Sequence, residues 1–238
     1  MKVLVAGATG ATGRLLVEQL LNDGHDVKVI VRSVDNLPKV PRLKDHLTII
    51  TASILDLNEA ELAGHVKGCD AVASCLGHNI TLKGIFGQPH LLVTQAVRNL
   101  CEAIRKNQSE MHTKFVLMNT TGNRNRGINE KFSLGGRFVI ALIRLLVPPM
   151  KDHELSADYL RTQSALEWTA VRPDTLIDQD QVSEYDVYPS PTRNPIFDPG
   201  KTSRINVAHF MSSLIVNEEL WNKWKGQMPV IYNREIKG

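Results

Sequence analysis

The chain opens with Met1-Lys-Val-Leu-Val-Ala-Gly7-Ala-Thr-Gly10-Ala-Thr-Gly13-Arg14, and this stretch decides the fold. Its apolar start predicts a buried strand, and the residues after Gly13 carry the spacing of an amphipathic helix. The glycines between them predict a tight strand-to-helix turn. In such a turn Gly7 permits the sharp bend, Gly10 lets a phosphate approach the backbone, and Gly13 permits close packing of helix and sheet.

A turn of this kind predicts a phosphate site, because a helix N-terminus offers unpaired N–H groups and the positive end of its dipole. The spacing is G-x-x-G-x-x-G, whereas many dehydrogenases have G-x-G-x-x-G. No Gly-Lys-Ser/Thr follows, which excludes a P-loop. The alternative is that this strand-to-helix turn has only a structural role and binds no phosphate.

Strands and helices alternate along the rest of the chain, which is typical of a doubly wound parallel α/β sheet of the Rossmann type. We expect residues 1–238 to form one domain, because the chain is long enough for one large α/β domain and short for two independent ones. Further strands are predicted at 26–31, 47–52, 69–77, 114–118, 167–173 and 229–232, and helices at 58–66, 91–106, 154–164 and 206–217.

The carboxyl ends of parallel strands meet at one edge of the sheet, where ligands bind. Arg32 ends the second strand, and no acidic residue precedes Asp35. An acid there would bond the ribose of NAD, whereas an arginine can grip the 2′-phosphate of NADP, so NADP(H) is favoured over NAD(H). The alternative is that Arg32 is a solvated charge.

Two irregular stretches, 123–150 and 178–204, are predicted to form the substrate side of the site. The first begins with a polar loop and contains an apolar segment, 138–147, expected to be a core helix. The second has several prolines and a β-like piece, Tyr185–Tyr188, and is predicted to be a lid.

Composition narrows the class of protein. A net charge of +3 gives no support to nucleic-acid binding, and the apolar stretch before Met150 is too short to span a bilayer. The three cysteines show no metal-binding or C-x-x-C spacing, so no metal is expected. A sparse, odd set of cysteines favours reduced thiols and a cytoplasmic location.

These motifs resemble the atypical short-chain dehydrogenase/reductase superfamily, in the NAD(P)H-binding group that includes flavin reductase-type biliverdin reductases and NmrA-like proteins. The landmarks are the glycine stretch, Arg32, Thr120-Thr121-Gly122 and the run ending Trp168-Thr-Ala-Val-Arg-Pro173. The resemblance covers nearly the whole chain. It implies that Thr9, Gly10, Ala11 and Thr12 contact the pyrophosphate, that Arg32 contacts the 2′-phosphate, and that Cys75, Leu76 and Gly77 line the nicotinamide ribose. The glycine turn and the strand ends add Gly7, Gly13, Ser53, Ile54 and Thr120 as expected contact residues, with the adenine beside Ser53 and Ile54.

One departure from that superfamily bears on the chemistry. Typical members use Tyr-x-x-x-Lys, in which the tyrosine donates a proton. Here Pro149 and His153 fall at those positions. Thr121 matches the family serine that bonds the substrate oxygen, and His153 is predicted to hold the ribose or carry protons near neutral pH. The alternative for His153 is a surface residue at a helix start.

Chemistry without a strong general acid fits hydride transfer from NADPH to a small flavin-like or quinone-like acceptor. The alternative is a redox sensor of the NmrA-like type that binds NADP(H) without turnover and acts on a protein partner. A sugar-nucleotide epimerase is disfavoured, because epimerases depend on the missing pair. We expect a monomer or homodimer.

Overall fold

The computed structural model describes residues 1–38, 45–78, 88–108, 112–128, 130, 148–194 and 197–234. The strands and helices alternate in the first half of the chain, as the sequence predicts. In chain order they are β1 (Lys2–Ala6), α1 (Gly13–Asn22), β2 (Asp26–Val31), β3 (Leu47–Thr51), α2 (Glu59–Val66), β4 (Ala71–Ser74), α4 (Leu92–Asn107), β5 (Lys114–Met118), α6 (Pro148–Arg161), β6 (Trp168–Pro173), β7 (Thr175–Ile177), β8 (Tyr185–Tyr188), β9 (Lys201–Ser203), α7 (Arg204–Val216), α8 (Glu218–Trp224) and β10 (Val230–Asn233).

The central sheet has eight strands in the order β3-β2-β1-β4-β5-β6-β10-β8. Every neighbouring pair is parallel except β10 with β8, which is antiparallel. The chain runs outward from β1 to β3, then returns to β4 on the other side of β1. This reversal creates a switch point between β1 and β4, the place where doubly wound sheets bind ligands. The predicted Rossmann-type fold is confirmed.

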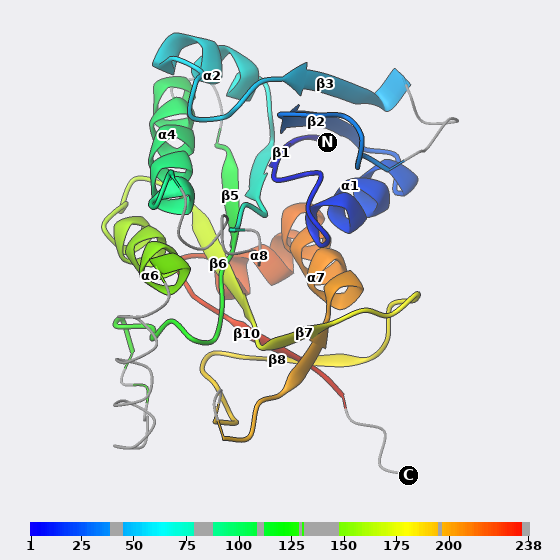
Figure 1. The fold of residues 1–238 in the computed structure, drawn as a ribbon, viewed down its shortest axis with the longest axis vertical. Helices are drawn as coiled ribbons and strands as arrows, with labels where there is room; N and C mark the ends of the chain where they lie inside the picture. The colour runs from blue at the N-terminus through cyan, green and yellow to red at the C-terminus, as the bar shows by residue number, and fades with distance from the viewer. Residues whose placement is uncertain are drawn as a thin grey trace.

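Helices cover both faces of the sheet, so the fold has three layers (Figure 1). Alternate residues of β1 divide between the faces, because successive side chains of a strand point to opposite sides. Val3 and Val5 pack with α1, α7 and α8, whereas Leu4 and Ala6 pack with α2, α4 and α6. Burial on both faces explains why the opening strand is an uninterrupted apolar run.

The predicted elements are found with small shifts in their ends, apart from α6. This helix begins at Pro148, six residues before the predicted start at 154, because proline is well accommodated in the first turn of a helix. Gly24 takes a positive φ of 79° just after α1, a conformation that glycine adopts readily where a helix ends. The predicted helix at 138–147 lies outside the described residues.

The segment 178–204 contributes to the sheet. Tyr185–Tyr188 is a strand, as predicted, and forms the antiparallel edge beside β10. Lys201–Ser203 pairs with Thr175–Ile177 in a separate two-stranded sheet (Figure 1). The strand β8 is therefore fixed by main-chain pairing, and only the rest of this segment is left for the predicted lid.

Arg172, in the run ending Arg-Pro173, is a fully buried structural anchor. Its Nε donates to the Met228 carbonyl at 2.8 Å, and its Nη1 to the Asn123 carbonyl at 3.0 Å. Its Nη2 lies 2.7 Å from Oε1 of Glu130, whose side chain is 1% exposed. These bonds tie the chain after β5 to β6 and to the start of β10.

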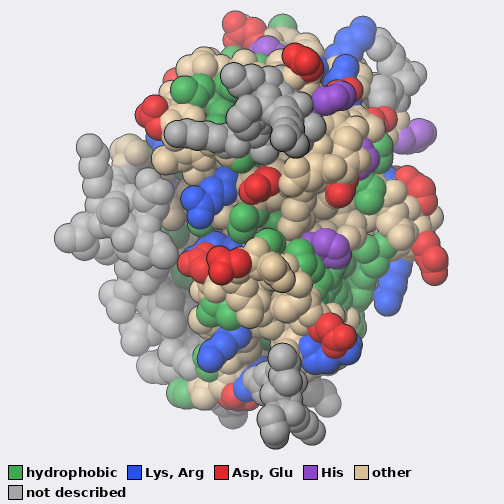
Figure 2. All heavy atoms as spheres, turned by 90° about the vertical axis from the view of Figure 1, so that its right-hand side faces the viewer, with side chains coloured by type: hydrophobic (Ala, Val, Ile, Leu, Met, Phe, Trp, Pro, Cys, Tyr) green, Lys and Arg blue, Asp and Glu red, His purple; other side chains and the backbone are tan. Residues whose placement is uncertain are grey.

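The surface seen in Figure 2 carries acidic and basic side chains intermingled. This distribution agrees with the small net charge of +3. All three cysteines are free thiols. Within the described ranges, no helix is both long and apolar enough to cross a membrane.

Candidate functional site

A cavity of about 360 Å³ lies at the carboxyl ends of β1, β2, β3 and β4, beside the switch point. The start of α4 closes its far side. The loops that leave the four strands, together with α4, supply the lining residues Ala6, Gly7, Thr9, Gly10, Ile30, Val31, Arg32, Ser33, Asn36, Ala52, Ser53, Ile54, Leu55, Cys75, Leu76, Gly77, Pro89 and Leu92.

The glycine turn forms one wall of this cavity through backbone contacts. Gly7 has a φ of 79°, and a Cβ there would lie 2.6 Å from the carbonyl carbon of Cys75. A Cβ on Gly13 would lie 2.1 Å from the Gly7 carbonyl oxygen. Both distances are far inside van der Waals contact, so neither position admits a side chain.

Gly10 has a different environment from the other two glycines. A Cβ there would lie 3.2 Å from the Gly7 oxygen and 4.0 Å from the Cys75 oxygen. Gly10 and Ala11 are exposed, and Gly10 lines the cavity. The backbone at Gly10 therefore faces open space that an anion can enter.

The N-terminus of α1 adjoins this open space. Thr12 precedes the helix and is buried, but its side chain makes no capping hydrogen bond. The first turn of α1 also has no acidic residue. The positive end of the helix dipole is therefore not neutralised by a side chain of that turn.

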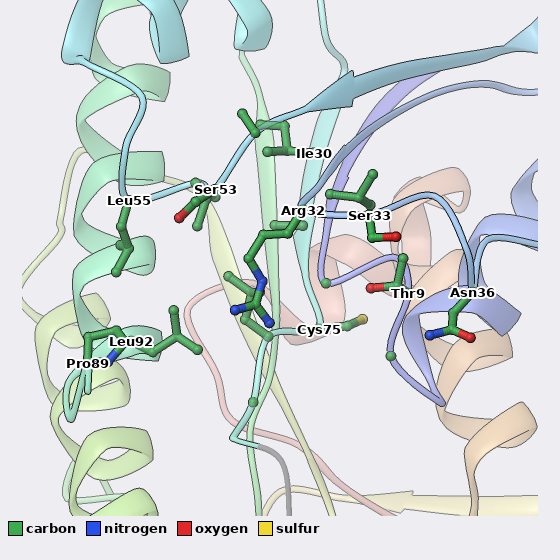
Figure 3. A pocket seen from close by; sticks show the side chains of 18 residues that line it. Thr9, Ile30, Arg32, Ser33, Asn36, Ser53, Leu55, Cys75, Pro89 and Leu92 are labelled. Carbon is green, nitrogen blue, oxygen red and sulfur yellow. The ribbon is translucent and has the colours of Figure 1, made fainter. Parts of the chain in front are cut away.

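Arg32 extends into the cavity from the end of β2 (Figure 3). It makes no ion pair with any residue in the described part of the chain. Thr9, Ser33 and Asn36 lie together at one side of the cavity, while Ser53, Leu55 and Leu92 lie at the other (Figure 3). The polar side chains on the first side and the Arg32 guanidinium thus face a second side that is more apolar.

Cys75 lies where β4 meets the glycine turn, with its Sγ 4.0 Å from Sδ of Met211. Burial raises the pKa of the Cys75 thiol to about 12. The thiol is protonated at neutral pH and is a poor nucleophile. It serves the site as a packing residue beside Gly7.

The chain after β5 forms the other end of the site. Thr121 is 2% exposed, and its N–H donates to the Pro173 carbonyl at 3.1 Å. Burial raises the pKa of Asp174, while hydrogen bonds from the Gly200 N–H and the Thr121 hydroxyl lower it. Neither Thr120 nor Thr121 belongs to the cavity lining.

Asp152, on α6, joins three parts of this region. Its Oδ2 accepts from the Val93 N–H and its Oδ1 from the Thr94 N–H, both at 2.8 Å. Its Oδ2 also lies 2.8 Å from Nε2 of His78. The carboxylate is fully buried and takes the place of a local cap for α4, since Leu91 provides none.

His153 follows Asp152 inside α6, with its ring against the cavity wall. The Nε2 atom lies 3.9 Å from where a Cβ on Gly77 would stand, and its backbone carbonyl accepts from Asn119 Nδ2 at 3.0 Å. The buried Nδ1 has no hydrogen-bond partner among the described residues. Burial lowers the pKa of His153 to about 4, so the ring is neutral at neutral pH.

The alternative of a surface histidine at a helix start is therefore wrong. His153 lies six residues into α6 and is half-buried. A group with a pKa of about 4 also does not exchange protons readily near pH 7, in contrast to the predicted proton carrier. Because the His153 ring lies beside Gly77, a role of His153 in holding the ribose stays a prediction.

Most predicted contact residues meet at the cavity, although their binding roles stay predictions. Gly7, Thr9, Gly10, Arg32, Ser53, Ile54, Cys75, Leu76 and Gly77 line it, whereas Ala11, Thr12, Gly13, Thr120, Thr121 and His153 do not. The sequence missed Ser33, Asn36 and Leu92, which line the cavity, and Asp152, which does not line it but joins α6 to α4. Among the described residues, no group of three His, Cys, Asp or Glu lies so that it could hold a metal ion.

A family model for NAD(P)H-binding proteins matches residues 7–218. The chain belongs to this NAD(P)H-binding family. The match begins at Gly7, the glycine that forms the turn, and includes every residue that lines the cavity except Ala6.

Two curated relatives come from Arabidopsis thaliana. An uncharacterized chloroplastic protein is 27% identical over 224 residues, which cover 92% of this chain and 73% of that protein. A chloroplastic epimerase family protein is 35% identical over 83 residues, which cover 35% of this chain and 22% of that protein.

Solved structures with the same fold extend over nearly the whole chain. The oxidoreductase ylbE from Lactococcus lactis has a TM-score of 0.69 and 17% identity, covering 99% of this chain and 92% of its own. A Streptococcus pneumoniae protein with the provisional name NADH-flavin reductase has a TM-score of 0.69 and 20% identity, covering 98% and 100%. A short-chain dehydrogenase/reductase from Veillonella parvula, in complex with NADP, has a TM-score of 0.70 and 14% identity, covering 98% and 94%.

The glycine turn yields a contrast between two alanine variants. Gly7→Ala should lower the free energy of unfolding by roughly 2–3 kcal/mol, because it combines a positive φ with a backbone clash. Gly10→Ala should cost less than about 1 kcal/mol in unfolding but weaken NADPH binding at least tenfold, because its methyl group occupies the phosphate approach. Urea denaturation and calorimetry measure both effects. Tight NADPH binding by a folded Gly10→Ala protein would contradict this account of the turn.

His153 predicts a pH dependence of stability. Its pKa is about 4 in the folded protein, against an ordinary value of 6.5. The unfolded chain therefore binds more protons between these values, and His153 lowers stability as the pH falls through that window. His153→Gln should flatten the curve of unfolding free energy between about pH 4 and pH 6.5. Urea denaturation across this range checks it, and an unchanged slope would refute the neutral buried ring.

Proposed function

We propose that this protein is an NADP(H)-dependent oxidoreductase that passes hydride to a flavin-like or quinone-like acceptor. The observation that carries the proposal is the open backbone at Gly10, between two glycines that admit no side chain and beside an uncapped helix N-terminus. This arrangement suits a pyrophosphate. The provisional name of the Streptococcus pneumoniae neighbour supports the choice of a flavin-like acceptor.

The residues at the cavity suit the parts of NADP(H). The backbone N–H groups of Ala11 and Thr12 would hold the pyrophosphate, with Thr9 beside them, because the Gly10 N–H already donates to the Gly7 carbonyl at 3.0 Å. Arg32 would hold the 2′-phosphate, with Ser33 and Asn36 nearby. The adenine would lie against the wall formed by Ser53, Ile54, Leu55 and Leu92. The nicotinamide ribose would lie against Cys75, Leu76 and Gly77, with Thr120 contributing from outside the cavity lining.

When bound, NADPH supplies the hydride. The residues of this chain bind and orient the reactants, because Pro149 and His153 stand where typical members have the proton-donating tyrosine and its lysine. A neutral His153 beside Gly77 can contact the ribose or the acceptor without adding charge. The Thr121 hydroxyl would fix the acceptor oxygen only after a small opening, since Thr121 is 2% exposed. Catalysis would then rest on proximity and orientation.

One observation favours the second candidate, a redox sensor that binds NADP(H) without turnover. Thr121 is buried against Asp174, and His153 is neutral, so neither presents a ready proton donor. A sensor needs only the dinucleotide site and a partner surface. Enzyme and sensor share the same cofactor site and differ in whether NADPH is consumed.

Cofactor preference tests the role of Arg32. Calorimetry should show that NADPH binds at least tenfold more tightly than NADH, since a charge-assisted hydrogen bond contributes about 1.5–3 kcal/mol. Arg32→Ala should remove most of this difference and leave NADH binding nearly unchanged. Lys106→Ala, which loses an exposed ion pair between α4 and Glu59 of α2, is the control and should match the wild type. Equal wild-type affinities for the two cofactors would refute the assignment.

Turnover separates the two candidate functions. The purified protein should oxidise NADPH in the presence of FMN, FAD or a soluble quinone, and the rate should saturate with acceptor. Arg32→Ala should raise the KM for NADPH while changing kcat little, because uniform binding energy is lost. NADPH that binds with every acceptor present and is never consumed would contradict the oxidoreductase and favour the sensor.

A further inference from the structure

Asp152 is an unusual helix cap, because it is remote and buried. The helix α2 is capped locally by Asn58, which forms a reciprocal capping box with Glu61. The helix α4 instead uses a fully buried carboxylate from α6. Burying a charge costs free energy unless donors satisfy it, and a Ser or Asn at position 91 would cap α4 without that cost. Capping of α4 therefore does not by itself explain why the cap is a buried carboxylate from α6.

The donors around Asp152 come from separate elements. Val93 and Thr94 give two N–H groups from α4, and His78 gives its Nε2 from the chain after β4. The Thr94 hydroxyl donates to the Asp152 carbonyl at 2.9 Å, which adds a bond from α4 to the backbone of α6. The negative charge also lies at the positive end of the α4 dipole.

Each part of this junction adjoins a residue at the site. Val93 follows Leu92 and His78 follows Gly77, and both Leu92 and Gly77 line the cavity. Asp152 itself precedes His153, whose ring lies against Gly77. One carboxylate thus fixes the α4 wall, the exit of β4 and the histidine relative to one another.

We infer that Asp152 is a positioning residue that holds the α4 wall, Gly77 and His153 at the spacing that NADP(H) requires. The inference rests on the proposed function, since it gives Asp152 a part in holding the dinucleotide. Asp152 does not line the cavity and acts through its neighbours.

The test uses Asp152→Asn in the full chain. The amide keeps the size of the side chain but directs an NH₂ group at one of the N–H donors, so the junction opens. Asn217→Ala is the matched control: it removes the side-chain cap of α8, which lies near the start of β5 and away from the cavity. Calorimetry should show a Kd for NADPH about tenfold higher in Asp152→Asn, and the wild-type value in Asn217→Ala, although both variants lose stability.

His78 provides a second test that does not depend on Asp152→Asn folding. His78→Ala should raise the Kd for NADPH about threefold. His78→Gln should restore it, because the glutamine amide can donate to the same carboxylate. Equal values for alanine and glutamine would overturn the inference.

Hydrogen exchange of the protein without NADPH gives a readout separate from binding. In Asp152→Asn, exchange should accelerate together in 74–78, 92–96 and 150–156. Acceleration confined to 92–96 would reduce Asp152 to a helix cap and overturn the inference. A wild-type protein that binds no NADP(H) would refute the proposed function, whereas equal Kd values in Asp152→Asn and Asn217→Ala would refute only the positioning role.

Discussion

The contact between Gly7 and the end of β4 governs the geometry of the site. The Gly7 backbone lies so close to the Cys75–Leu76 peptide that a Cβ would fall within 2.6–2.8 Å of backbone atoms. Because these atoms belong to the backbone, no side-chain movement can relieve the clash. The contact exists because β1 and β4 are parallel neighbours, with Ala6 opposite Ser74. The glycine turn and the exit of β4 therefore form one wall, and the cavity opens beside it.

The two ends of the site are built by different means. Backbone packing defines the glycine end, so its shape depends on a few positions without side chains. Side chains define the opposite end, where Asp152 joins α6 to α4 and Asn119 Nδ2 donates to the His153 carbonyl. The buried charge of Asp152 is compensated by its donors and by the dipole of α4. The buried Nδ1 of His153 has no hydrogen-bond partner among the described residues, and burial lowers the pKa of the ring so that it is neutral at neutral pH.

Arg32 and Arg172 show how burial assigns opposite roles to the same residue type. Both lie at the carboxyl ends of parallel strands, Arg32 just after β2 and Arg172 within β6, and both belong to landmarks of the sequence. Arg172 is fully buried, paired with Glu130 and bonded to backbone carbonyls. Arg32 extends into the cavity without an acidic partner in the described ranges. A guanidinium with satisfied donors stabilises the fold, whereas one without a partner is available to a phosphate.

The sequence by itself determined the fold class, the family resemblance and half of the residues that line the cavity, because the glycine turn and the strand ends depend on local patterns of glycine and apolar residues. It also pointed to Arg32, which directly follows β2, and to Ser53, which lies shortly after β3. Only the tertiary structure decided the roles of Asp152, Leu92 and Arg172, and the burial of Thr121 and His153. Those properties arise where α4, α6 and the loops after β4 and β5 meet. Burial and hydrogen bonding there depend on residues distant in the chain, so no local pattern could have revealed them.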